Sequence, residues 1–135
     1  MPINITPLID AIKQLEEGLR RCEADRSDTL ARDGTIQRFE YTYELAHKMM
    51  KRYLEATEAN PDTLDKMTFP DIVRLASERG LVMRGWDAWS DYRTARGTTS
   101  HTYDEKKAAQ VFSAIPQFLE DAQFLRDEIL KRQKK

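Results

Sequence analysis

The segment with the clearest chemical potential is Arg96-Gly-Thr-Thr-Ser-His101-Thr-Tyr103, in the second half of the chain. It gathers a guanidinium, an imidazole and a phenol within a few residues. Arginine is always charged and its planar fork fits phosphate oxygens, whereas histidine titrates near neutral pH. The pair can therefore hold a phosphodiester while the imidazole acts as a general base. On RNA, that base would deprotonate a 2′-hydroxyl for in-line attack on the adjacent phosphorus, a step that needs no metal.

The residues around the histidine predict where it lies. Thr102-Tyr-Asp-Glu105 fits the capping box Ser/Thr-x-x-Glu, which predicts Thr102 as the N-cap of the last helix. His101 then lies just outside that helix, and its positive N-terminal field favours a neutral imidazole and a bound anion. We expect the bridge from Gly97 to Ser100 to fold back so that Arg96 and His101 face one point, with Ser100 and Thr102 as supporting residues.

Simpler interpretations of the same residues stay open. Arg96 can form an ion pair with Asp91 or Asp104 while His101 only packs at a helix start. A tyrosine at position 103 is also commonly a packing residue. The spacing Glu44-x-x-His47 is typical of di-iron bundles, but a second such pair is missing, because Thr98 stands three residues before His101. The aromatic residues of the fourth expected helix could stack on bases, but core packing is the favoured interpretation for Trp86, Trp89 and Tyr92.

Apolar residues recur at helical spacing, and no strand-like alternation competes with them. The sequence therefore predicts an all-α, up-and-down antiparallel bundle of four to five helices, as one domain over residues 1–135. We expect the first helix to have Thr6 as its N-cap, and a loop to follow at residues 26–34. The second helix has Thr35 as its N-cap and ends at Asn60-Pro61-Asp62, and the third starts at Thr68 or Phe69 and is followed by Gly80. The fourth helix starts near Gly85, and the last helix is long and tolerates Pro116.

Composition limits the classes of function. The formal net charge is −1, which argues against a general nucleic-acid coat, so any contact with nucleic acid must be local. A single cysteine, Cys22, excludes an internal disulfide and a cysteine-based zinc site. No signal segment or membrane span is evident, so we expect a soluble cytoplasmic protein. No nucleotide-binding glycine loop is present, so nucleotide transfer would belong to a separate polypeptide.

Two segments resemble a known family. Residues 37–48, Gln-Arg-Phe-Glu-Tyr-Thr-Tyr-Glu-Leu-Ala-His-Lys, are similar to the second helix of HEPN-domain proteins of the nucleotidyltransferase substrate-binding branch. Residues 91–105, with Arg-x4-His-x-Tyr, are similar to the active-site segment of that branch. The two segments occur in the family's order, and the resemblance covers essentially the whole chain.

The resemblance implies a function. It implies that Arg96 and His101 are the catalytic pair of a metal-independent endoribonuclease that uses no cofactor. It implies a homodimer in which two such motifs converge on one cleft that binds RNA. It also implies a toxin–antitoxin pair, in which a separately encoded MNT-type nucleotidyltransferase attaches AMP to Tyr103 and blocks the cleft.

One residue departs from the family pattern. Much of the family has a polar residue, commonly asparagine, after the arginine, whereas this chain has Gly97. Glycine cannot supply the amide donor, which weakens the expected catalysis but leaves phosphate binding possible. The alternative function is therefore a non-catalytic substrate-binding or scaffold subunit of a two-component nucleotidyltransferase. A helical dimerisation module with a vestigial motif is the third interpretation.

Overall fold

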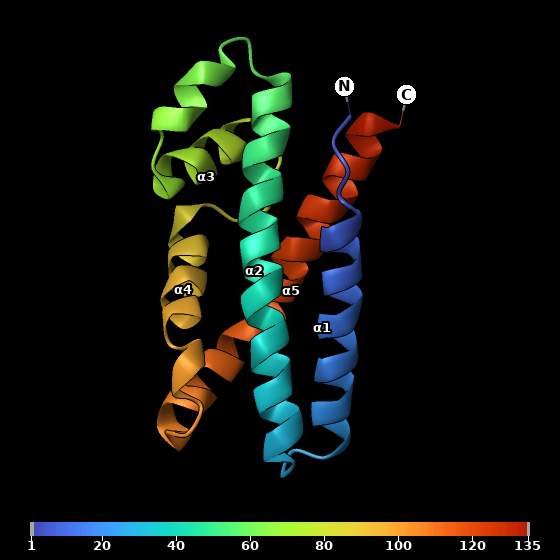
Figure 1. The fold of residues 1–135 in the computed structure, drawn as a ribbon, viewed down its shortest axis with the longest axis vertical. Coiled ribbons are helices and arrows are strands. Elements are labelled where there is room, and N and C mark those ends of the chain that lie inside the picture. Colours follow the sequence, from blue (N-terminus) through green and yellow to red (C-terminus); the bar gives the residue numbers. More distant parts are fainter. Residues whose placement is uncertain (1, 135) are drawn as a thin grey trace.

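The computed structural model describes residues 2–134 and contains five α-helices. These are α1 (Thr6–Ala24), α2 (Thr29–Thr57), α3 (Phe69–Glu78), α4 (Trp86–Gly97) and α5 (Glu105–Gln133). Two short 3₁₀ segments, η1 (Pro61–Lys66) and η2 (Thr99–His101), connect them. The helices α1, α2, α4 and α5 alternate in direction, and the short α3 crosses one end (Figure 1). The expected all-α, up-and-down bundle is confirmed.

The long α2 is the centre of the bundle, since it packs against α1, α3, α4 and α5. Aromatic side chains of α2, α4 and α5 pack together, most of them edge to face. They are Phe39, Tyr43, Trp89, Tyr92 and Phe118, all of them buried. Trp89 and Tyr92 are thus core residues, as expected, and Trp86 is half-buried against Phe69. Within residues 2–134, no helix has the length and apolarity needed to cross a bilayer.

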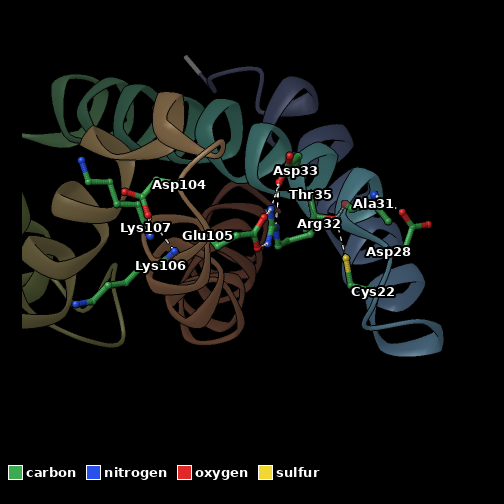
Figure 2. A network of polar contacts seen from close by, with 10 residues as sticks. All are labelled: Cys22, Asp28, Ala31, Arg32, Asp33, Thr35, Asp104, Glu105, Lys106 and Lys107. Atoms are coloured by element: carbon green, nitrogen blue, oxygen red, sulfur yellow. Dashed lines mark hydrogen bonds and ion pairs between the residues drawn. The ribbon is translucent and has the colours of Figure 1, made fainter.

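The junction of α1 and α2 differs from the prediction. Residues 26–34 were expected to be a loop with Thr35 as a cap, but α2 already begins at Thr29, because the Asp28 carboxylate accepts from the Ala31 N–H. Thr35 lies inside the helix, where its hydroxyl donates to the Ala31 carbonyl at 2.8 Å (Figure 2). A Cβ on Gly18 would stand 2.6 Å from the Thr35 Oγ1, so glycine is what allows α1 and α2 to approach this closely.

Other helix ends follow the sequence signals. Thr68 caps α3 by accepting from the Asp71 N–H, and Gly80 follows with a positive φ of 67°. Gly85 precedes α4 as expected. The prediction of Thr6 as the N-cap of α1 is wrong. Ile5 holds that position, and Thr6 is the first helical residue, whose N–H donates to the Asn4 side chain.

A buried carboxylate holds α4 onto α5. Asp121 is fully buried, and its Oδ2 accepts from the Tyr92 hydroxyl and, at 3.1 Å, from Arg84 Nη1. Burial first, and then the hydrogen bond to Asp121, raises the pKa of Tyr92. Tyr92 lies one helical turn before Arg96, so this bond also fixes the end of α4 that carries the candidate site.

Candidate active site at the end of α4

Arg96 stands in the last turn of α4 and points to α2 rather than to its own neighbours. Its Nε and Nη2 donate to Glu44 Oε1 at 3.1 and 2.5 Å, and its Nη1 lies 3.3 Å from Glu40 Oε2. The side chain is 35% exposed. The hydrogen bond to Glu44 raises the pKa of the Arg96 guanidinium, which stays charged. Carboxylates thus occupy the position that a bound phosphate would take.

The simpler alternative for Arg96, an ion pair, is found, but its partners are not Asp91 or Asp104. Arg96 contacts two carboxylates that lie one turn apart on α2. The reason is packing, since α4 lies against α2 and the end of α4 brings the guanidinium to that face. Asp104 has a different role at the start of α5.

A tight turn links α4 to His101. Thr99 is buried, and its hydroxyl lies 3.0 Å from Glu40 Oε2 and 2.9 Å from the Arg96 carbonyl oxygen. The His101 N–H donates to the Thr98 carbonyl, and the Asp104 N–H donates to the His101 carbonyl. Hydrogen bonds therefore constrain the backbone from Arg96 to Asp104, and Glu40 contacts both Arg96 and Thr99.

His101 and Tyr103 contact each other directly. His101 Nδ1 lies 3.1 Å from the Tyr103 hydroxyl, and the two rings meet edge to face. His101 is half-buried, whereas Tyr103 is 81% exposed, so Tyr103 is not a packing residue. With Nδ1 engaged, Nε2 is the ring nitrogen left for other chemistry. Among residues 2–134, no hydrogen bond joins the side chains of Arg96 and His101.

The capping box predicted at Thr102 is wrong. Helix α5 begins at Glu105, and Asp104 is its N-cap, accepting from the N–H groups of Lys106 and Lys107 at 3.0 and 3.2 Å. Glu105 does not reach back along the chain. It pairs with Arg32 of α2 at 2.7 Å, and that bond lowers the pKa of the Glu105 carboxyl (Figure 2). Aspartate is preferred over threonine at the N-cap, so Asp104 rather than Thr102 caps the helix.

With Asp104 as the N-cap, the two residues expected to support the site, Ser100 and Thr102, have no capping role. Ser100 is exposed and Thr102 is half-buried, and within residues 2–134 neither side chain makes a hydrogen bond. His101 precedes the cap by three residues, inside η2, so the field of α5 acts on it less directly than expected. Sequence reasoning missed Glu40, Glu44 and Thr99 as neighbours of Arg96. The one available signal was that both glutamates lie in the α2 segment that resembles the family.

The bundle and the Arg-x4-His-x-Tyr segment between its last two helices define a class, the HEPN and nucleotidyltransferase substrate-binding proteins. The family model described as "Nucleotidyltransferase substrate binding protein like" matches residues 3–131, and the chain belongs to that family.

Two relatives from Haemophilus influenzae are similar to this chain. The protein named "Probable ribonuclease HepT" is 42% identical over 99 residues, which cover 73% of this chain and 67% of that protein. The solved structure of HI0074, described as the fold of a substrate binding domain of a nucleotidyltransferase, is 35% identical. It superposes with a TM-score of 0.87 over 94% of this chain and 99% of that one.

Proposed function

We propose that this chain is a HEPN-type endoribonuclease that needs no metal and acts as the toxin of a toxin–antitoxin pair. The observation that carries the proposal is the placement of Arg96 at the end of α4 and His101 in the adjoining turn, both accessible to solvent. The ribonuclease description of a relative with 42% identity supports it. We expect RNA as the substrate, two copies of the chain around it and a cytoplasmic location.

The reaction follows from the chemistry of the two side chains. The RNA phosphate replaces the glutamates on the Arg96 guanidinium, which neutralises charge that develops on the phosphoryl oxygens. Neutral His101 accepts the 2′-hydroxyl proton at Nε2, and the 2′-oxygen attacks the adjacent phosphorus. The bond to the 5′-oxygen breaks, that oxygen takes a proton from water, and His101 releases its own proton to solvent. The products are a 2′,3′-cyclic phosphate and a 5′-hydroxyl.

Tyr103 is placed for control of this reaction. Its hydroxyl is exposed and adjacent to His101. We propose that a separately encoded MNT-type nucleotidyltransferase transfers AMP from ATP to this oxygen and releases pyrophosphate. The attached nucleotide would place a negative phosphate beside the guanidinium, which competes with RNA.

The test is cleavage of RNA by the purified protein in excess EDTA. We expect cleavage by the wild type, at least 100-fold loss in Arg96→Ala and His101→Ala, and cyclic phosphate ends, in line with the usual contribution of a general base. Arg26→Ala is the control because it removes an exposed cation of the turn after α1, outside the candidate site. Equal activity in the wild type and both site variants would contradict the proposal. Tyr103→Phe should remain active and should no longer accept AMP from a cognate nucleotidyltransferase.

The second candidate is a non-catalytic substrate-binding subunit of a nucleotidyltransferase. Two observations favour it, namely the occupation of Arg96 by Glu40 and Glu44 and the glycine at position 97. It predicts no RNA cleavage but stable co-purification with a nucleotidyltransferase, with transfer activity that depends on this chain.

A further inference from the structure

A group of basic side chains outside the candidate site lies along one face of α2. Lys48, Lys51 and Arg52 line a cavity of about 350 Å³, together with His47 and two glutamates, Glu44 and Glu55. We call Lys48, Lys51 and Arg52 the α2 basic strip. Lys48 and Arg52 are exposed, so their charges face solvent and are available to a ligand.

Several charges at this face have no carboxylate partner. Glu44 is held by Arg96, and Asp65 lies 4.0 Å from Lys51. Within residues 2–134, Lys48, Arg52 and the nearby Arg93 of α4 form no ion pair. Three cations and two glutamates line the cavity, so its lining has a surplus of one positive charge, and Arg93 adds a second cation beside it.

A second helix contributes to the same face. The pKa of His47 is lowered by burial first and then by the charges of Lys51 and Arg93, which shows that cations from α2 and α4 converge on this ring. The His47 ring packs on Phe69 with centroids 3.8 Å apart, and both rings are half-buried. Aromatic surface beside a basic groove is the combination that binds single-stranded nucleic acid.

The strip continues the candidate active site. Glu44 both holds Arg96 and lines the cavity. Glu44, Lys48 and Arg52 follow one another at intervals of four residues, so they share one helix face. The distance from position 44 to position 52 is about 12 Å along the axis, at 1.5 Å per residue. A chain with its phosphate on Arg96 can therefore run along α2 over the strip.

We propose that the α2 basic strip, with Arg93, is a subsite for the backbone phosphates of single-stranded RNA that flank the scissile phosphate at Arg96. This proposal rests on the proposed ribonuclease function. The strip supplies affinity for longer substrates and takes no part in bond cleavage. Continuity with the candidate phosphate site of Arg96 favours RNA over an acidic protein surface as the ligand.

The binding experiment uses Lys48→Gln/Arg52→Gln in the full chain, with His101→Ala added so that RNA stays intact. The control is Lys13→Gln/Arg26→Gln, which removes two exposed cations, from α1 and the turn after it, that have no ion pair with any residue of the described part of the chain. The affinity for a fluorescent single-stranded RNA of about 20 nucleotides is measured at several salt concentrations. We expect the strip variant to lower the slope of log K against log salt by about 1.4, at about 0.7 per lost phosphate contact. An unchanged slope, or the same loss in the control, overturns the proposal.

A second measurement separates this proposal from the proposed function. A dinucleotide has a single phosphate, which would occupy Arg96 and leave none for the strip. If both proposals hold, the strip variant with native His101 cleaves the dinucleotide like the wild type but has a raised KM for long RNA. If the wild type cleaves neither RNA but the strip variant still lowers the slope of log K against log salt, the ribonuclease function is contradicted and the subsite is not. Normal cleavage with loss of binding only to a polyglutamate probe shows that the strip binds acidic protein and overturns the subsite.

Discussion

Arg96 and Glu44 are 52 positions apart in sequence, and their side chains form two hydrogen bonds to a single carboxylate oxygen, at 3.1 and 2.5 Å. The pair joins the end of α4 to the middle of α2. Because the guanidinium is a third exposed, a ligand phosphate can approach it, but it must compete with the glutamate. In the free protein, Glu44 therefore restrains the Arg96 guanidinium, which is the group expected to bind RNA.

Glu44→Gln should strengthen RNA binding. Glutamine keeps the length of the side chain and one acceptor oxygen, while the competing negative charge is lost. Exposed ion pairs contribute up to about 1 kcal/mol, so the Kd should fall by about two- to fivefold. Titration of fluorescent RNA in a His101→Ala background measures this. Glu55→Gln is the matched control, since it lines the same cavity but has no contact with Arg96. Weaker binding in Glu44→Gln would show that the pair orients Arg96 for phosphate.

Gly97→Asn should raise the rate of RNA cleavage. A Cβ at position 97 meets no atom within 4 Å, and its backbone φ is not positive, so asparagine fits without strain. The new amide would donate to the phosphate beside Arg96, as implied by the family pattern. We expect a gain of about tenfold in kcat/KM, which corresponds to one hydrogen bond of about 1.4 kcal/mol to a charged group. Gly97→Ala fills the same space without a donor and should show no such gain.

Asp104→Ala and Asp28→Ala form a matched pair. Each aspartate is an N-cap, of α5 and α2 respectively, and each loss should lower the free energy of unfolding by about 1 kcal/mol. Only Asp104 belongs to the turn that carries His101 and Tyr103. Urea unfolding and RNA cleavage are measured for both variants. Cleavage should fall in Asp104→Ala alone, and an equal fall in both would indicate a general effect of stability.

Acid should destabilise the fold through His47. Its pKa lies below the ordinary value of 6.5, so the folded state binds this proton less readily than the unfolded state. This contribution to stability is complete above pH 6.5 and is lost as the pH falls through the lower, folded-state pKa. Urea midpoints between pH 7.5 and pH 5 should decrease less in His47→Gln than in the wild type. An equal decrease in His47→Gln and the wild type would refute the assignment.

Local signals in the sequence predicted the helices and several of their ends well. The expected roles are found for Thr68 as the N-cap of α3, Gly80 as the residue with positive φ after α3, and Gly85 as the residue before α4. The prediction failed where two good caps compete within a few residues. Asp28 caps α2 inside residues 26–34, which were expected to be a loop, and Asp104 caps α5 in place of Thr102.

The surroundings of Arg96 could not be predicted from its neighbours in the chain. Glu40 and Glu44 reach it only because α4 packs on α2. Their spacing of four residues was visible in the sequence, but it does not indicate which cation lies opposite. The shared phosphate pocket of Arg96 and His101, the homodimer and the single domain over residues 1–135 remain predictions.

The two ends of the described chain are held together by a pair of reciprocal bonds. The Ile3 N–H donates to the Gln133 side chain at 2.8 Å, and the Gln133 amide donates back to the Ile3 carbonyl at 3.2 Å. Both ends lie away from the junction of α4 and α5 (Figure 1). Ile3 and Gln133 are therefore close enough in space for a short linker to join them. A circular permutant with that linker, opened in the exposed turn between α1 and α2, should fold. Reporter proteins attached near Ile3 or Gln133 of the unpermuted chain would lie away from any nucleic acid at the junction of α4 and α5 (Figure 1).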